Sequence, residues 1–158
     1  MGTLRGSFDN VNVPRGRNCT LIDSRVQGTV YVRSNASVSV YRTVILGNVQ
    51  AEGARFVRLY GTGVVVNGSV QIKYGTQATT INPGTQIGGN VQYVESSGFL
   101  KILRARVGQD VQVFENVGGA SIYYNVINGN LQCKENDPAP TGDNNQVGGN
   151  KEDQCSTF

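Results

Sequence analysis

A five-residue phrase that returns about every 20 residues constrains the fold more than any other feature of this chain. The phrase is a glycine, a small polar residue and an apolar–polar–apolar triplet, as in Gly47-Asn48-Val49-Gln50-Ala51. Its copies begin at positions 9, 28, 47, 68, 89, 109, 129 and 149, so the intervals are 19, 19, 21, 21, 20, 20 and 20 residues. A period this regular indicates a solenoid, in which each repeat forms one coil.

Two further apolar patches occur in each interval. The second patch follows the phrase by about ten residues and comprises Val38 and Val40, Val57 and Leu59, Leu100 and Ile102, and Ile122 and Tyr124. The third precedes the next glycine and comprises Val26, Ile45, Val64 with Val66, Ile87, Val107, Ile127 and Val147. Three short strands per period are what one coil of a β-helix requires, and stacking buries the inner faces. We therefore predict an all-β, single-stranded parallel β-helix of about eight coils of roughly 20 residues.

Other repeat folds fit the pattern less well. A leucine-rich repeat requires a Leu-x-x-Leu-x-Leu phrase, and a β-propeller requires a period near 40 residues. A left-handed hexapeptide helix would show a six-residue rhythm. A β-sandwich would also give short strands every 8–12 residues, but it would not return one phrase at one offset. The sandwich is the remaining alternative.

The chain is predicted to be a single β-solenoid domain, 1–158. We expect residues 1–8 to form an N-terminal lead-in, 9–133 the regular coils and 134–158 a C-terminal cap. The glycine that heads most copies is expected at a corner where the backbone takes a positive φ.

The polar residue inside each triplet is expected to point outward. Stacked one coil apart, these residues would form a ladder of amides, which can hydrogen-bond along the stack. The column comprises Asn12, Tyr31, Gln50, Gln71, Gln92, Gln112 and Gln132. Two interpretations stay open: the ladder only stabilises the rod, or the glutamines form a flat polar face that binds a glycan or another extracellular polymer.

The three cysteines are expected to have different roles. Cys19 aligns with Val38 and Val57, which predicts a buried apolar side chain. Cys133 and Cys155 lie about one coil apart and are predicted to form a disulfide that staples the C-terminal end. A disulfide indicates an extracellular or cell-surface location. No N-terminal segment has the pattern of a signal peptide, so we expect such a signal to be missing from this sequence.

Composition argues against several classes of function. The chain has no histidine, so Ser-His-Asp and Cys-His catalytic sites are ruled out, and no phosphate-binding Gly-Lys loop is present. The carboxylates do not repeat at one offset, and their spacing near the C-terminus fits no calcium loop. We therefore expect no metal site, no cofactor and no catalytic residues. A scattered net charge of +3 argues against nucleic acid, and no 18-residue apolar run predicts membrane insertion.

The Gly-Asn-Val-Gln phrase on its 20-residue period resembles right-handed parallel β-helix proteins of the pectate-lyase-like superfold over nearly the whole chain. The segment from Asn130-Leu131-Gln132-Cys133 to Gln154-Cys155 resembles the C-terminal segment of uncharacterised bacterial secreted proteins. The resemblance implies a right-handed coil. It implies little about function, because this fold hosts many functions. Enzymes of the superfold use calcium ligands and a basic catalytic residue in a groove of long loops, whereas the coils here are lean. Bactofilin-like filament proteins have shorter coils.

Three functions are compatible with these observations. The first is a non-enzymatic structural or interaction module, a rigid secreted or surface rod. The second is a carbohydrate-binding or polysaccharide-cleaving β-helix. The third is a self-assembling filament unit that associates through its coil ends, because an uncapped end exposes strand edges.

Overall fold

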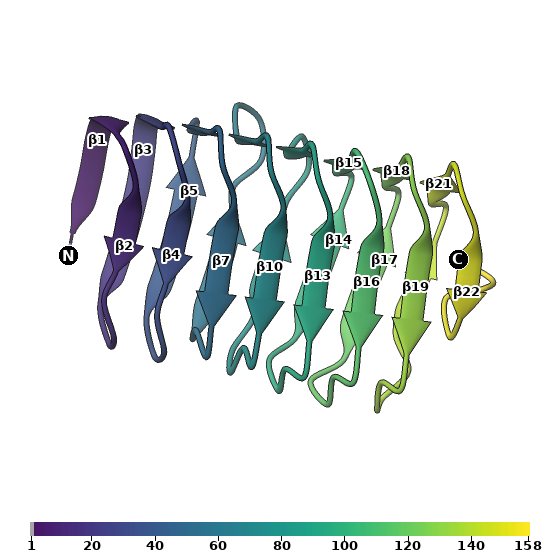
Figure 1. Cartoon of the computed structure of the whole chain (residues 1–158). Coiled ribbons are helices and arrows are strands. Elements are labelled where there is room, and N and C mark those ends of the chain that lie inside the picture. Colours follow the sequence, from purple (N-terminus) through teal and green to yellow (C-terminus); the bar gives the residue numbers. More distant parts are fainter. Residues whose placement is uncertain (1) are drawn as a thin grey trace.

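The computed structural model describes residues 2–158, and all its regular elements are β-strands. Strands stack in three rows, one strand of each row per coil (Figure 1). The first row, an eight-stranded sheet, contains β2 (Val11–Val13), β4 (Val30–Val32), β7 (Val49–Glu52), β10 (Val70–Lys73), β13 (Val91–Val94), β16 (Val111–Phe114), β19 (Leu131–Lys134) and β22 (Lys151–Asp153).

The other two rows join in one 14-stranded sheet, because the long strand β3 (Asn18–Val26) belongs to both. The second row continues with β1 (Thr3–Phe8), β5 (Ser37–Tyr41), β8 (Phe56–Leu59), β11 (Thr79–Ile81), β14 (Leu100–Leu103), β17 (Ala120–Tyr123) and β20 (Thr141–Asp143). The third row continues with β6 (Val44–Ile45), β9 (Val65–Val66), β12 (Gln86–Ile87), β15 (Arg106–Val107), β18 (Val126–Ile127) and β21 (Gln146–Val147).

The register matches the sequence period. Val70 pairs with Val49 on one side and with Val91 on the other, and all strand pairs are parallel. In Figure 1 the near strands run downward, the far strands run upward and the chain advances from left to right, so the coil is right-handed. The predicted right-handed parallel β-helix of about eight coils is confirmed, and the two ends of the chain lie at opposite ends of the rod.

The interior is filled by the apolar columns that the sequence pattern indicated. Val38, Val57 and Val66 are fully buried, and the third patch forms an unbroken column from Val26 to Val147. One expectation was wrong. Tyr124 was predicted to point inward with Ile122, but it is 49% exposed because its φ of 57° turns the chain outward at the corner after β17.

The repeated glycine is needed for a reason other than the predicted one. None of the glycines that head the phrase has a positive φ. Instead, the neighbouring coil approaches too closely for a side chain. A Cβ built on Gly68 would lie 2.3 Å from Asn48 Oδ1 and 2.7 Å from the Gly47 carbonyl oxygen. The prediction of positive φ at this position was therefore wrong, and close approach explains the glycine.

The polar residue after the glycine contributes to this close approach, together with the backbone of the neighbouring coil. Asn48 Oδ1 accepts a hydrogen bond from the Ser69 backbone N–H at 2.8 Å, so the side chain passes over the intervening glycine. The same bond joins each coil to the next along the whole rod. The column comprises Asn10, Thr29, Asn48, Ser69, Asn90, Asp110, Asn130 and Asn150.

Positive φ occurs instead at the corners that follow the first and second strands of a coil. The left-handed residues other than glycine are Asp23, Asn35, Arg42, Tyr74, Glu95, Arg104, Glu115, Tyr124, Glu135, Asn144 and Asp153. Apart from Asp153, each is followed by a buried residue. The left-handed conformation thus turns the next side chain back into the rod.

The two ends extend the stack. Residues 3–8, within the predicted lead-in, form β1, which pairs with β3 and packs Leu4 and Phe8 against the core; Met1 lies outside the described residues. Within the predicted cap, β20, β21 and β22 keep the register of the preceding coils. Residues 2–158 include no helix long and apolar enough to cross a membrane.

Candidate binding face

The predicted glutamine ladder lies on the outer face of the first row of strands. Gln50, Gln71, Gln92, Gln112 and Gln132 occupy the same position of β7, β10, β13, β16 and β19. From Gln50 to Gln112, each Nε2 donates to the Oε1 of the glutamine on the next coil, at 3.1, 2.8, 2.8 and 3.0 Å. The ladder is therefore a continuous chain of amide hydrogen bonds that runs along the rod.

The ladder has one direction, and Glu152 sets it. Gln132 Nε2 donates to Glu152 Oε2 at 2.7 Å. A carboxylate accepts hydrogen bonds and does not donate them, so Gln132 must present its N–H group to this end of the column. Every earlier glutamine then presents its N–H group in the same direction. At the other end Tyr31 replaces glutamine, and Gln50 Oε1 accepts no hydrogen bond from any residue of the range 2–158.

Part of this face is hollowed into a trough of about 500 Å³ that crosses four strands. Three of the five predicted site residues, Gln50, Gln71 and Gln92, line it, whereas Gln112 and Gln132 continue the ladder beyond its lining. The remaining lining residues are Tyr31, Val32, Arg33, Ala51, Glu52, Ile72, Lys73 and Val94. A second hollow of about 520 Å³ shares Arg33 and Glu52 with the trough and continues round the corner to Tyr74.

Charges of both signs border the trough. Arg33 Nε donates to Asn12 Oδ1 at 3.1 Å, and its guanidinium lies 5.3 Å from the centre of the Tyr31 ring. Lys73 Nζ lies 3.1 Å from Glu95 Oε1, and the hydrogen bond to this carboxylate raises the pKa of Lys73. Because these groups are exposed, the pairs orient side chains more than they stabilise the fold.

The glutamines retain hydrogen-bonding capacity for a ligand. A primary amide has two N–H donors and two acceptor lone pairs. Within the ladder, Gln71 and Gln92 each use one donor and one acceptor, which leaves one of each. Repeated at the coil spacing of about 4.8 Å, these groups form a row that matches a ligand able to donate and accept at each step.

Two more amide ladders lie inside the rod, and the sequence analysis missed both. Asn116 donates to the Tyr93 carbonyl and to Asn136 Oδ1, each at 2.9 Å, and its own Oδ1 accepts the Ser96 backbone N–H. Asn125 forms the corresponding bonds to Ile102 and Asn145 at the other corner. The available signal was the 20-residue spacing of these asparagines, each directly after a corner residue.

Asn136 and Asn145 lie in the C-terminal segment whose carboxylate spacing fits no calcium loop. Both are buried, at 6% and 5% exposure, and their side chains are engaged in the internal ladders. Within residues 2–158, no three His, Cys, Asp or Glu side chains cluster in a way that could hold a metal ion.

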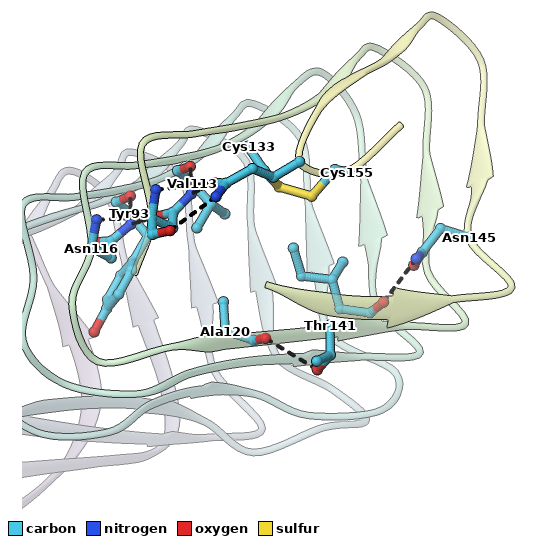
Figure 2. Close-up of a disulfide and its surroundings, with 11 residues drawn as sticks. Tyr93, Val113, Asn116, Ala120, Cys133, Thr141, Asn145 and Cys155 are labelled. Atoms are coloured by element: carbon cyan, nitrogen blue, oxygen red, sulfur yellow. Dashed lines mark hydrogen bonds between the residues drawn. A yellow bond between two sulfur atoms is a disulfide. The ribbon is translucent and has the colours of Figure 1, made fainter. Parts of the chain in front are cut away.

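The cysteines lie where the sequence placed them. Cys133 and Cys155 form a disulfide with their Cα atoms 5.3 Å apart, and Figure 2 shows it inside the coil outline. Cys19 is free and buried, and this burial raises the pKa of its thiol. The disulfide joins the last coil to the one before it.

Comparison with known proteins adds no family to this description. No protein-family model, no curated protein and no solved structure matches the chain.

Proposed function

We propose that the chain is a non-enzymatic structural or interaction module, a rigid rod of the extracellular space or the cell surface. The observation that carries the proposal is the side-chain bonding between coils. The glutamine ladder, the column that starts at Asn10 and the internal asparagine ladders add to the backbone bonds of the sheets. Satisfied polar networks of this kind rigidify a structure. The disulfide supports an oxidising compartment.

Rigidity can be tested in solution. Small-angle scattering of the full chain should give a rod about 35–40 Å long, the length of eight stacked coils. Hydrogen exchange should show similar protection of the coils from β4 to β19, because each is bonded to both neighbours. Rapid exchange confined to several internal coils would contradict a rigid module, because it would show that the stack opens locally.

A second candidate function is binding of a neutral linear glycan in the trough, and the free amide groups favour it. Hydroxyl groups donate and accept, so they match the donor and acceptor that each glutamine leaves free. An extended peptide is a poorer match, because its residues repeat at about 3.3 Å and the coils at about 4.8 Å. Tyr31 at the end of the trough offers an aromatic ring for stacking.

We propose binding of the glycan and not its cleavage. Glycoside hydrolysis commonly uses two carboxylates on either side of the scissile bond. Among the residues that line the trough, Glu52 is the one carboxylate. Its neighbours on the same column are Arg33 and Lys73, which supply charge but no second acid.

The ladder itself supplies a matched pair of variants. Gln71→Ala and Gln132→Ala each interrupt the ladder, but Gln71 lines the trough and Gln132 does not. Both should lower the free energy of unfolding by about 1 kcal/mol. With neutral cello-, chito- and xylo-oligosaccharides as probes in calorimetry, Gln71→Ala should weaken binding about tenfold, equivalent to about 1.4 kcal/mol. Equal loss in both variants, or no binding by the full chain, would leave the ladder a structural feature.

A further inference from the structure

The two ends of the rod carry complementary unfinished columns. In the column after the glycine, each side-chain oxygen from Asn10 to Asn130 accepts a backbone N–H of the next coil. Within residues 2–158, Asn150 Oδ1 at the C-terminal end accepts no hydrogen bond, and the Asn10 N–H at the N-terminal end donates none. Each end therefore presents the group that the other end lacks.

The strand edges match in the same way. The N–H of Val11 and the carbonyl of Val13 bond to the second coil, so the backbone groups of Asn12 between them face away from the rod. At the other end, Lys151 of β22 is in register with Leu131 on its inner side only. If the rod were continued by one coil, the Lys151–Asp153 edge would meet the Val11–Val13 edge in the register used throughout the stack.

The charges of the two ends also favour docking of the first coil of one copy onto the last coil of another. The first coil carries Arg5, Arg15 and Arg17 with Asp9. The last segment carries an excess of carboxylates over its two lysines, Lys134 and Lys151. These carboxylates belong to Glu135, Asp137, Asp143, Glu152 and Asp153.

One ion pair shows how the ends would meet. Arg5 binds Asp23 on the next coil, and Asp23 also binds Arg42 at 2.7 Å, so cation and anion alternate along the rod. The hydrogen bond from Arg42, with a further one from Arg5, lowers the pKa of Asp23. In the register of the stack Asn144 occupies the position of Asp23, and Asp143 of β20, which is exposed, precedes it at the same corner of the rod. A second copy that stacks its first coil on this last coil would bring Arg5 next to Asp143.

The C-terminal tail occupies the space that a following coil would need. Residues 154–158 turn back over the end of the rod, with bonds from the Cys155 and Phe158 N–H groups to the Glu152 and Cys155 carbonyls. Phe158 is 7% exposed, and its ring lies so close to Gly142 that a Cβ there would be 2.3 Å from Phe158 Cδ2. Gly142 is the last member of the inner column that contains Ile122, so Phe158 closes the core.

We infer that the last and first coils form a head-to-tail interface for a second copy of this chain, and that the tail, residues 154–158, keeps this interface closed. The inference goes beyond the proposed function, because it concerns the ends of the rod and not its lateral face. The occupant is a second copy because the columns, strand register and charges of the two ends match each other.

The direct test removes the tail. The variant that lacks residues 154–158 also carries Cys133→Ala, so that no free thiol replaces the disulfide. The matched control is the full chain with Cys133→Ala and Cys155→Ala, which keeps Phe158. Sedimentation velocity and electron microscopy should show elongation that increases with concentration for the tail-less chain, and single rods for the control. Single tail-less rods at every soluble concentration, or elongation of the control, would overturn the inference.

The interface can be checked through its charges. In the tail-less chain, Arg5→Glu or Asp143→Arg alone should raise the concentration needed for half-assembly at least tenfold, roughly 1.4 kcal/mol per tenfold change. The two substitutions together should restore assembly, because the pair is re-formed with its signs exchanged. Assembly that is indifferent to all three variants would show contact through another surface and would overturn the inference.

Three further measurements keep the test decisive if the truncated chain folds poorly. Circular dichroism and thermal unfolding establish whether the tail-less chain is folded. The variant Phe158→Asp keeps every other residue and the disulfide, and it should also elongate. In addition, full chain added to a tail-less stack should shorten it, because the added copy docks by its first coil and then presents a closed tail. Single Phe158→Asp rods or unchanged stack lengths would count against the closed interface.

Discussion

Gln132 donates a 2.7 Å hydrogen bond to the carboxylate of Glu152, and this bond fixes the direction of the whole glutamine ladder. An amide column has no preferred direction by itself, because each amide can donate either way along the stack. A terminal group that only accepts removes this choice. The ladder therefore presents its free acceptor at Gln50, at the trough.

Substitution of Glu152 tests how the direction is set. Glu152→Lys replaces an acceptor by an ammonium group opposite the Gln132 N–H group, which leaves two donors facing each other. We expect a loss of about 1 kcal/mol in the free energy of unfolding, measured by urea denaturation. Glu152→Gln keeps an acceptor and should change stability much less. Equal stability of the lysine and glutamine variants would contradict the directional ladder.

The internal asparagines should be more sensitive than the external glutamines. Asn116→Asp removes the donors to Tyr93 and Asn136 and buries a carboxylate near two acceptor oxygens. We expect a loss of about 3 kcal/mol at neutral pH, because the Ser96 N–H still donates to the new carboxylate, but the second carboxylate oxygen has no donor and faces two acceptors.

The loss at Asn116→Asp should depend on pH. Burial raises the pKa of the introduced carboxyl in the folded chain, so the variant loses stability as pH rises and regains part of it in acid, where the protonated group can donate again. The control Asn150→Asp changes the same residue type at an exposed position and should have little effect. Similar losses at both positions would argue against the internal ladder.

The fold was predictable because the core columns depend only on the period. Val49, Val70 and Val91 lie at equal offsets, pair with one another in the stack and are all buried. The external ladder followed from the same offsets, because Gln50 and Gln71 alternate with inward apolar residues. Along the straight strands, the alternation of apolar and polar residues was therefore sufficient to predict which side chains point inward.

The corners were not predictable in the same way. Alternation fails where a left-handed residue reverses the direction of the next side chain, as at Glu115 before Asn116 and at Asn144 before Asn145. Tyr124 was misplaced because it is itself such a left-handed residue: it is exposed, and the next residue, Asn125, is buried. The trough could not be found either, because its hollow depends on how four coils sit against one another. A side chain at position 68 would clash with the neighbouring coil, and composition alone cannot show this contact.

The repeated glycine gives a steric prediction. Gly68→Ala would bring Cβ within 2.3 Å of Asn48 Oδ1. Either the two coils must separate, or the hydrogen bond from the Ser69 N–H to Asn48 Oδ1 must break. We expect a loss of about 3 kcal/mol, at the upper end of typical overpacking costs. Gly2→Ala is the control, because nothing lies within 4 Å of its Cβ position. Thermal unfolding that is the same for both variants would disprove the close approach.

Tyr93 predicts an alkaline limit to stability. Its side chain is buried, its hydroxyl donates to the Gly98 carbonyl at 2.8 Å, and burial raises its pKa to about 12. In the unfolded chain this hydroxyl has the ordinary pKa near 10. The contribution is complete below about pH 10 and is lost as the pH rises toward 12, because the unfolded chain releases the proton first.

The loss from Tyr93 should be on the order of 2 kcal/mol between these limits. Tyr93→Phe removes the group that titrates, so its stability should fall less steeply in this range, although it starts lower at neutral pH. Urea denaturation of both chains at pH 8, 10 and 11 measures the difference. Parallel curves would show that the Tyr93 hydroxyl is not held in its neutral form.

The stacking of equivalent positions is tested most directly by spin-label distances on the full chain. Glu52 and Lys134 are four coils apart on one face, and Thr20 and Thr141 are six coils apart on another. At about 4.8 Å per coil, the backbone separations should be about 19 and about 29 Å. Pulsed electron resonance should give narrow distributions that differ by about two coil spacings. Equal distances for the two pairs, or broad distributions, would contradict the β-helix and every functional inference built on it.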